Sequence, residues 1–489
     1  MRDIDAEEIA EMIMRKHRFV SFADNSSMYI ERGGVFQPNG ESWIKQQAEQ
    51  LVAYSTNHYR NEVAHHVREK NLKERSEIRD SGWAYIGVEN GVLDVRTTQF
   101  YTPEEFNAKF DDVFLFNRIP VHYDPSAHSR HFLPWLRQFQ DDPVKRQTLL
   151  DHFASTLDKR CTKRRGLLLV GPPDSGKTTF LGWETRLLGD VNTSGIPLAM
   201  LCDAADKFSK SRLFGKMLNT QDDLPDVKLN YLADFKQLTG GMMLSAQQKN
   251  KPGFDFWPYT KLHFSCNKAP ELPEKDFTDS AFWGRWDFMT CSHEFKEKER
   301  NYLARVATPE ELSGILNILL RVVKDQIERD GFATDPNPLD VKAAWLGQAA
   351  PAYSFLSQYV YKDPNSPGLK HAELSKAWEH YRVEGGHSPI SSIEFNRTVT
   401  ALFGCDPQTV RGKSKTWLGI SIKAGKYNSA NDTNLTDFSP IVYRYGIIEG
   451  NRKKAVNSVK VESDISLGMR LLENPPECSP LDGDQEGPQ

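Results

Sequence analysis

The chain has 489 residues, a formal net charge of −4 at pH 7, 39% hydrophobic residues and 26% charged residues. A chain of this length is expected to form about three domains, and its ordinary composition indicates globular ones. The slightly negative net charge excludes a basic coat over the whole surface, so contacts with nucleic acid would have to come from local basic patches.

Six cysteines lie far apart in the sequence, and no two form a Cys-x-x-Cys pair. This spacing argues against a disulfide framework or a cysteine zinc site and indicates reduced thiols in the core. No apolar stretch approaches the roughly 18 residues needed to cross a membrane, and residues 1–18 alternate acidic and basic side chains where a signal peptide would be apolar. We therefore expect a cytoplasmic protein that does not enter a membrane.

Residues 1–130 are expected to form an N-terminal α+β domain. Asn90-Gly91 lies between two apolar runs within residues 83–95, W-A-Y-I-G-V-E-N-G-V-L-D-V, and predicts a β-hairpin. Hydrophobic periodicity predicts the other elements of this domain, which are a helix over 5–16, strands near 19–22 and 28–30, and helices within 42–70.

A glycine-rich loop follows the apolar run Leu167 to Val170, and its residues 171–178 read G-P-P-D-S-G-K-T. The pattern G-x-x-x-x-G-K-[ST] after a buried strand predicts a phosphate-binding loop, because the backbone N–H groups turn inward toward an anion. Lys177 is expected to reach the β- and γ-phosphates of ATP, and the Thr178 hydroxyl to ligate Mg²⁺. The residues predicted to bind the nucleotide are Gly171, Pro172, Pro173, Asp174, Ser175, Gly176, Lys177, Thr178 and Thr179.

Two carboxylates follow the stretch G-K-M-L-N-T-Q, which begins at residue 215. The interval after Lys177 is long enough for one helix and a strand that returns beside the first. Hydrolysis needs a carboxylate that holds Mg²⁺ or polarises water, so Asp222 and Asp223 are the predicted metal ligands and catalytic carboxylates. The sequence leaves open which of them plays which role, and an acidic turn before Leu224 is the alternative.

Two further polar residues follow in the same region. The run Lys261 to Cys266 predicts a strand that ends at Asn267, where open α/β sheets bind ligands and an amide can orient the attacking water. Arg285 lies in the aromatic stretch F-W-G-R-W-D, and an arginine there can neutralise charge on the transferred phosphoryl group. The alternatives are a simple turn at Asn267 and an arginine stacked on a neighbouring tryptophan.

Basic residues at two places are predicted to bind DNA. Lys249 and Lys251 fall at the expected tip of a hairpin, where cations beside an aromatic residue suit a nucleic-acid backbone. A solvated loop explains these two charges equally well. The second group of basic residues predicted to bind DNA is Arg411, Lys413 and Lys415, in an expected β-ribbon.

That ribbon completes a winged-helix domain predicted over residues 350–425, with helices near 373–382 and 393–403. The wing is expected to contact DNA phosphates, while a structural or protein-binding role also fits its small charge excess. Residues 450–489 lack periodicity and end in an acidic stretch, which predicts a disordered tail.

The order of these motifs resembles that of the superfamily-3 helicases, and most closely the C-terminal half of plasmid, phage and poxvirus primase-helicases. The resemblance covers most of residues 80–425. Residues 83–95 are similar to the region upstream of the family's ATPase, residues 171–178 to its Walker A loop, and residues 215–225 to its Walker B stretch.

The resemblance continues through residues 235–241, which are similar to the family's L-K-x-L-T-G-G-D segment. Asn267 is similar to the family's sensor asparagine, and Arg285 to the arginine before the last strand of its core. The sequence departs from the family at three positions. Asp223 replaces the family's usual Glu, Met242 stands where Asp is common, and Gly284 precedes Arg285 where many members carry a second arginine.

The resemblance implies an α/β fold with a P-loop, AAA+-like parallel-sheet core over residues 131–340, including a helical lead-in. It implies a hexameric ring in which ATP and Mg²⁺ sit on one subunit, Asn267 and the carboxylates position water, and Arg285 arrives from the neighbour. Lys249 and Lys251 would then move single-stranded DNA, and duplex DNA would meet the winged helix. The sequence leaves open whether a primase acts in trans.

The function implied is an ATP-dependent DNA helicase that serves replication of a plasmid, virus or integrated element. Two alternatives stay open. One is an ATP-dependent winged-helix initiator that binds DNA without unwinding it, and the other is a P-loop motor for genome packaging.

Overall fold

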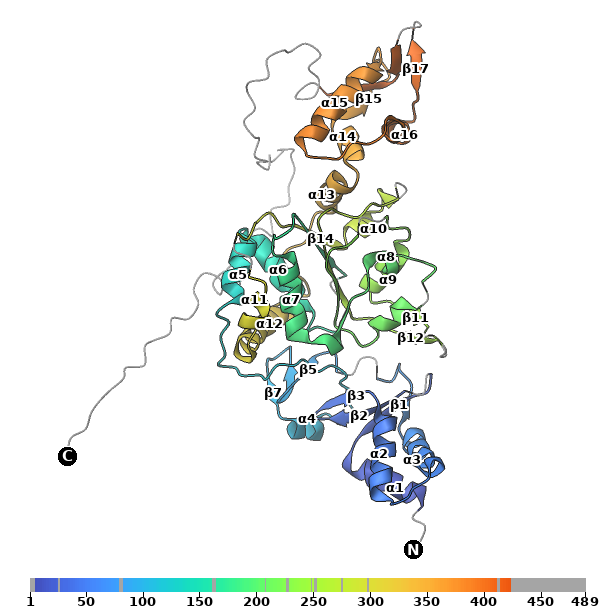
Figure 1. Ribbon diagram of the computed structural model, residues 1–489, viewed down its shortest axis with the longest axis vertical. Coiled ribbons are helices and arrows are strands. Elements are labelled where there is room, and N and C mark those ends of the chain that lie inside the picture. The colour runs from blue at the N-terminus through green and yellow to red at the C-terminus, as the bar shows by residue number, and fades with distance from the viewer. Residues whose placement is uncertain are drawn as a thin grey trace, which may run out of the picture.

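The computed structural model in Figure 1 has three parts that follow one another along the long axis of the molecule. A mixed N-terminal part lies at one end, a parallel sheet between helices lies in the middle, and a small helical and β part lies at the other end. No helix in the described part of the chain is long and apolar enough to span a membrane. The structure describes residues 5–24, 27–78, 82–160, 164–206, 208–225, 228–247, 249, 253–273, 276–296, 299–410 and 414–423.

The N-terminal part begins with a four-stranded sheet of order β3-β2-β1-β4, in which only β4 is parallel to its neighbour. Helix α1 begins where the Asp5 carboxylate accepts a hydrogen bond from the Glu7 N–H at 3.2 Å, and its apolar face packs into a core with α2 and α3. The elements are α1 (Ala6–Lys16), β1 (Phe19–Phe22), β2 (Met28–Arg32), β3 (Val35–Gln37), α2 (Gly40–Leu51), α3 (Asn57–Lys70) and β4 (Leu72–Lys73).

The predicted hairpin near Asn90 is confirmed, with its turn one residue earlier than expected. Val88 pairs with Gly91, so the two loop residues are Glu89 and Asn90. Gly91 belongs to the strand, where a Cβ atom would lie 2.3 Å from the Tyr101 carbonyl oxygen, so this position requires glycine. The hairpin strands and their neighbours are β5 (Tyr85–Val88), β6 (Gly91–Asp94), β7 (Phe100–Tyr101) and α4 (Pro103–Lys109).

The middle part contains a five-stranded sheet of order β14-β8-β13-β10-β9, in which all neighbouring strands run parallel. The predicted α/β core with a parallel sheet is therefore confirmed. Its elements are α5 (Phe132–Phe139), α6 (Pro143–Ser155), β8 (Gly166–Val170), α7 (Lys177–Leu188), η1 (Asp190–Asn192), β9 (Thr193–Ser194), α8 (Leu198–Leu201), η2 (Ser209–Leu213), β10 (Leu218–Gln221), α9 (Ala233–Thr239), β11 (Leu244–Ala246), β12 (Phe254–Phe256), β13 (Lys261–Cys266), α10 (Ser280–Trp283), β14 (Trp286–Thr290), α11 (Tyr302–Val306), α12 (Pro309–Arg329) and α13 (Pro338–Ala349).

Strand β8 is apolar throughout because both of its faces are covered. Leu167 and Leu169 pack into one hydrophobic core with α5, α6, α7 and α12, while Leu168 and Val170 pack into a second core with α8, α9, α10 and α13. Strands buried on both faces are expected to show such continuous apolar runs. The arrangement holds the carboxyl ends of β8, β13 and β10 at one edge of the sheet.

The expectation that β10 returns beside β8 is wrong. The chain between Lys177 and Asp222 contains two strands, β9 at the far edge and then β10, and the later strand β13 occupies the place beside β8. All six residues of β13 are buried, whereas β10 ends in half-buried residues, so the more apolar strand takes the more central position.

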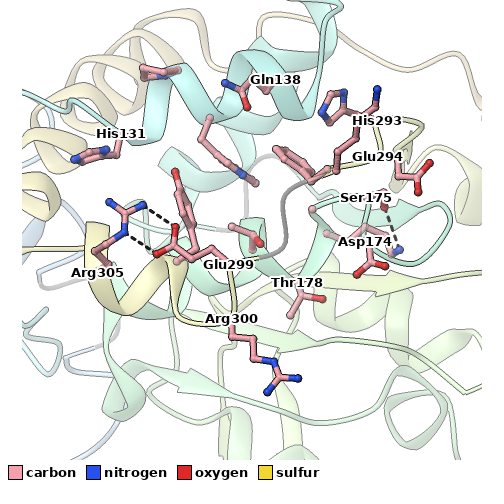
Figure 2. Close-up of a pocket in the computed structure, with 18 of the residues that line it drawn as sticks. His131, Gln138, Asp174, Ser175, Thr178, His293, Glu294, Glu299, Arg300 and Arg305 are labelled. Carbon is pink, nitrogen blue, oxygen red and sulfur yellow. Dashed lines mark hydrogen bonds and ion pairs between the residues drawn. The ribbon is translucent and has the colours of Figure 1, made fainter.

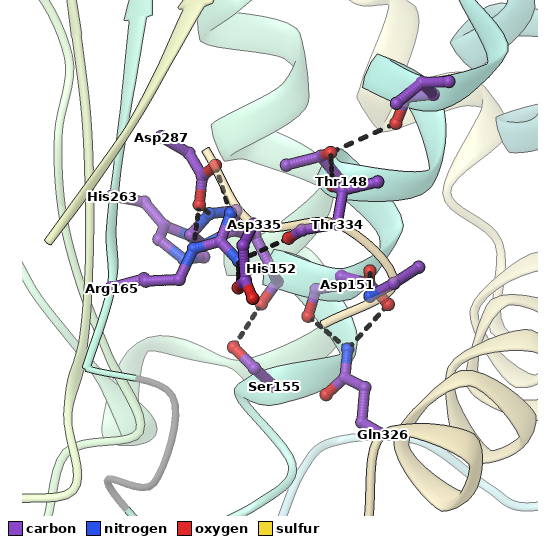
Figure 3. A network of polar contacts seen from close by, with 12 residues as sticks. Thr148, Asp151, His152, Ser155, Arg165, His263, Asp287, Gln326, Thr334 and Asp335 are labelled. Atoms are coloured by element: carbon purple, nitrogen blue, oxygen red, sulfur yellow. Dashed lines mark hydrogen bonds and ion pairs between the residues drawn. The ribbon is translucent and has the colours of Figure 1, made fainter. Parts of the chain in front are cut away.

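A buried polar network links α6 to the sheet (Figure 3). Asp287 of β14 lies 2.7 Å from the His152 Nε2 atom and accepts hydrogen bonds from the Arg165 guanidinium. The His152 ring also meets the His263 ring edge to face, with centroids 5.1 Å apart, and the His263 Nδ1 atom lies 2.8 Å from the Glu184 carboxylate of α7. The network therefore spans from the helix after the glycine-rich loop to the strand that follows Arg285.

The C-terminal part packs three helices against short antiparallel strands. Trp417 and Trp378 lie in its core with Phe355, Phe395 and Val399. The two helices predicted here are present, and the predicted tail, 450–489, lies outside the described residues. The elements are α14 (Pro351–Tyr359), β15 (Val360–Lys362), β16 (Leu369–Lys370), α15 (His371–Glu384), α16 (Ser392–Phe403), β17 (Pro407–Val410), β18 (Ser414–Trp417) and β19 (Ile420–Ile422).

Candidate functional site

The glycine-rich loop joins β8 to α7. Two of its positions require glycine because neighbouring groups lie too close for a side chain. A Cβ atom on Gly171 would lie 2.0 Å from the Cys291 carbonyl oxygen. Gly176 adopts a φ of +91° just before α7, and a Cβ atom there would lie 2.7 Å from a ring carbon of Phe295. The loop is therefore held in shape by glycine backbone and by the segment that follows β14.

Lys177 points its ammonium group into this loop. Its Nζ atom donates hydrogen bonds to the carbonyl oxygens of Gly171 at 2.8 Å and Pro172 at 2.7 Å, and to the Ser175 hydroxyl at 3.2 Å. A fourth contact, at 3.3 Å, reaches the Asn267 side-chain oxygen at the end of β13. The cation is thus fixed between the loop and the neighbouring strand.

The three predicted polar residues beyond the loop lie together at the same edge of the sheet. The Asn267 amide nitrogen lies 3.4 Å from a carboxylate oxygen of Asp223, so Asn267 bridges Lys177 and Asp223. Asp223 has a φ of +51°, and its N–H donates to the Asp222 carboxylate at 3.0 Å. The Ser265 hydroxyl of β13 also donates to Asp222, a contact that the sequence did not predict.

A cavity of about 1140 Å³ adjoins the loop (Figure 2). Small-molecule pockets typically measure about 300–1,000 Å³, so this one has room for a nucleotide and water. Its floor is the loop from Asp174 to Thr179, one wall is α5, and the other wall is the chain after β14. Residues of these two walls are Arg130, His131, Pro134, Trp135, Gln138, His293, Glu294, Phe295, Lys296, Glu299, Arg300, Tyr302 and Arg305.

Aromatic rings line part of this cavity. The Trp135 ring stacks on Phe139 with centroids 5.0 Å apart and lies nearly parallel to Phe295 at 6.3 Å. Such a wall beside a phosphate loop suits a flat heterocyclic base. The cavity also carries several cations, and Arg305 is the one held by a two-contact ion pair with Glu299, at 2.7 and 2.8 Å. Hydrogen bonds from Arg305 lower the pKa of Glu299, which keeps that pair charged.

Arg285 lies away from this cavity. It precedes β14, and its carbonyl oxygen accepts a hydrogen bond at 2.8 Å from the N–H of Gly166, the first residue of β8. Arg285 therefore lies at the amino ends of the strands, opposite the edge that carries Lys177. Its Nε atom is buried and has no hydrogen-bond partner among the described residues, and burial lowers the pKa of its guanidinium.

The residues predicted to bind DNA lie in other places. Lys249 is exposed in the turn between β11 and β12, and Lys415 is exposed on β18. Lys251, Arg411 and Lys413 lie outside the described residues. Lys249 and Lys415 do not line the cavity, and the contact of these basic residues with DNA stays a prediction.

Sequence reasoning missed the two walls of the cavity. His131, which precedes α5, shares one face with Trp135 and Gln138 of that helix, a spacing that a search for paired polar and aromatic positions would find. Phe295 carries no local signal, because only the packing of the chain after β14 brings it over the loop.

Comparisons with known proteins name no activity. A family of unknown function, DUF5906, matches residues 169–285, which run from β8 to Arg285. No curated protein matches the chain. Solved structures titled as the C-terminal region of NrS-1 are 12% identical, with TM-scores of 0.43 and 0.46, and the match covers 86% of this chain and 100% of the other. Likeness at this level does not carry an activity across.

Proposed function

We propose that the chain is an ATP-dependent DNA helicase that hydrolyses ATP between the subunits of a ring and serves replication of a plasmid, virus or integrated element. The observation that carries the proposal is the line of contacts from Lys177 through Asn267 to Asp223. It joins a phosphate-binding cation, a polar amide and a carboxylate at the carboxyl edge of a parallel sheet, where such sheets bind ligands.

The side chains at this edge fit ATP and Mg²⁺. Thr178, Asp222 and Asp223 offer the hydroxyl and carboxylate oxygens that Mg²⁺ prefers. Mg²⁺ would supply positive charge against the phosphate oxygens as the terminal phosphate leaves. Lys177 would neutralise the same oxygens from the loop side, and the stacked rings around Trp135 would hold the base.

Asn267 and Asp223 would orient the attacking water. The Asn267 amide is held by Lys177 on one side and faces the Asp223 carboxylate on the other, so a water between them can be aligned and its proton accepted. Asp222, fixed by the Ser265 hydroxyl and by the Asp223 N–H, is better placed to hold the metal.

The position of Arg285 supports hydrolysis between subunits. A strand rises about 3.3 Å per residue, so the five residues of β8 separate the two edges of the sheet by about 16 Å. Arg285 would then serve the loop of a neighbouring copy, which a hexameric ring provides. Lys249 and Lys251 would contact single-stranded DNA in that ring, and the C-terminal ribbon would contact duplex DNA.

An unwinding assay on a forked DNA duplex tests this function. The wild-type chain is expected to separate the strands with ATP and Mg²⁺ and to fail with a non-hydrolysable analogue. Lys177→Ala should abolish both hydrolysis and unwinding, because it removes the cation facing the phosphates. Lys145→Ala, which changes an exposed lysine on α6, is the matched control and should behave as wild type.

Two results would redirect the proposal. Hydrolysis and DNA binding without strand separation would favour an initiator whose ATPase drives assembly. Wild-type turnover by Lys177→Ala would show that the loop is not the catalytic site.

A further inference from the structure

Two arginines precede neighbouring strands and lie at the amino edge of the sheet. Arg164 precedes β8 and Arg285 precedes β14, and these two strands are paired so that Gly166 lies opposite Trp286. The Gly166 N–H bonds the Arg285 carbonyl oxygen at 2.8 Å, which brings the two stretches of backbone together. Arg164 is exposed and has a φ of +51°, a conformation that is uncommon outside glycine and is often found at functional positions.

Three neighbouring charged groups in the described part of this edge have partners. Arg165 is bound by the Asp287 carboxylate, and the Lys261 ammonium donates to the carbonyl oxygens of Asp158 and Arg160 at 2.8 Å. Asp279, the acidic group that faces Arg285, is engaged by Lys236 at 2.7 Å. Among the described residues, no carboxylate forms an ion pair with either Arg164 or Arg285.

The pair is therefore two like charges, and Asp279, the carboxylate that acts on Arg285, forms its ion pair with Lys236 instead. Burial lowers the pKa of Arg285, and the nearby positive charge of Arg164 lowers it further. An arrangement of this kind is unfavourable until an anion binds, and guanidinium groups are well suited to phosphate because of their planar, forked donors. The Nε atom of Arg285 is buried and lacks an acceptor among the described residues, so no hydrogen bond there holds the guanidinium to its own chain.

We propose that Arg164 and Arg285 of one subunit together bind the terminal phosphate of the nucleotide held on the loop of the next subunit. This inference rests on the proposed function and extends it, because it assigns Arg164 a catalytic role across the subunit interface. Arg164 stabilises the charge that develops on the phosphoryl oxygens, alongside Arg285. Neither arginine reaches the loop of its own subunit, which lies at the opposite edge of the sheet.

Kinetics of single variants give the first test. Arg164→Ala is expected to bind a fluorescent ATP analogue as wild type does and to assemble normally, while kcat falls at least tenfold with little change in KM. Arg164→Lys keeps the positive charge but lacks the forked donors of a guanidinium, so it should retain part of the ATPase activity. Arg212→Ala removes an exposed arginine that precedes β10 at the same edge, and as the matched control it should keep wild-type kcat.

Mixing of subunits gives the second test, because it reports on which side of the interface a residue acts. Arg164→Ala mixed with the Asp222→Asn/Asp223→Asn double variant should regain ATPase activity, since some interfaces then combine an intact pair with intact carboxylates. Arg164→Ala mixed with Arg285→Ala should stay inactive, because each subunit then presents an incomplete pair.

The outcomes separate this inference from the proposed function. If Arg164→Ala keeps wild-type kcat while Arg285→Ala does not, the assignment of Arg164 is overturned and the helicase proposal stands. Recovery of activity in the Arg164→Ala and Arg285→Ala mixture would likewise overturn a joint site. If the wild-type chain itself hydrolyses no ATP, the proposed function fails and this inference fails with it.

Discussion

At the scale of single residues, the candidate site depends on close contacts that few side chains can replace. The Lys177 ammonium has four neighbours, three from the loop and one from the end of β13. Gly176 supplies the backbone turn just before that lysine and lies against Phe295. The same few contacts therefore set the shape of the loop and the position of the lysine. Substitutions at these residues should weaken nucleotide binding more than they destabilise the fold.

Gly176→Ala tests this dependence. A Cβ atom would lie 2.7 Å from Phe295 and 2.9 Å from Phe139, at a φ of +91° that other residues rarely adopt. The expected result is a loss of nucleotide affinity of at least about tenfold, from strain of about 1–2 kcal/mol and from the displaced ring. Affinity is measured by titration with a fluorescent ATP analogue.

Gly215→Ala separates strain from steric clash. Gly215 has a φ of +73°, and an added methyl carbon would meet no other group within 4 Å, so its substitution brings backbone strain alone. This variant should lose stability by about 1–2 kcal/mol and keep its nucleotide affinity. Equal affinity loss in both variants would mean that general destabilisation, not the loop, controls binding.

At the scale of elements, the parallel sheet sets which side chains can act together. The carboxyl ends of β8, β13 and β10 bring Lys177, Asn267 and Asp223 to one edge, while the amino ends of β8 and β14 carry Arg164 and Arg285 at the other. Behind them, the network of Figure 3 fixes β14 against α6 through Asp287 and His152. The two edges are therefore parts of one rigid layer.

The sequence predicted which segments form strands better than it predicted the order of those strands in the sheet. The apolar run before Gly171 and the polar residue at the end of β13 carry strong local signals, and the parallel α/β core that they indicate is present. The place of β13 beside β8 carries no such signal, because it depends on which strand can be covered on both faces. Phe295 and Arg164 were unpredictable for the same reason, since tertiary packing alone brings them to their sites.

The His152 contact predicts a pH dependence of stability. Burial lowers the pKa of His152 to about 4 from 6.5, so the folded chain keeps this group neutral where the unfolded chain binds a proton. Its contribution to stability is complete above about pH 6.5 and is lost as the pH falls toward 4. Although burial opposes it, hydrogen bonds from His152 and the Arg165 guanidinium hold the pKa of Asp287 below its ordinary value.

Urea unfolding of wild type and His152→Gln at several pH values checks this prediction. The difference in unfolding free energy between the two should change by up to about 3 kcal/mol between pH 6.5 and pH 4, with wild type losing more. Comparing the two chains cancels the effects of Glu184 and Asp151, whose pKa values burial raises. A pH-independent difference would contradict a neutral buried His152.

At the scale of the whole molecule, the N-terminal part braces the predicted DNA-contacting hairpin. The Arg75 guanidinium lies over the rings of Phe214 at 4.5 Å and Phe254 at 5.1 Å, and it is paired with Asp24 beside β1. Phe254 begins β12 and pairs with Ala246, so the N-terminal part contacts the end of the hairpin strands that is nearest to the turn with Lys249. Under the proposed function, this contact would hold the hairpin in place while its turn contacts DNA.

The hairpin lysines predict a change in salt dependence. Replacing Lys249 and Lys251 by Ala should weaken binding to single-stranded DNA and reduce the slope of log affinity against log salt by about 1.4, because two phosphate contacts are lost. Fluorescence anisotropy over a range of salt concentrations measures this slope. Lys415→Ala should leave it unchanged, and an unaltered slope in the double variant would place the DNA elsewhere.

The most direct measurement of the central claim is ATPase activity in mixed rings of Arg285→Ala and the Asp222→Asn/Asp223→Asn double variant. Each variant alone should bind ATP and hydrolyse it slowly, with losses of about a thousandfold for the arginine. In the mixture, interfaces that combine intact carboxylates with an intact Arg285 should restore part of the activity. A mixture that stays inactive, although mixed rings form, would contradict hydrolysis shared between subunits.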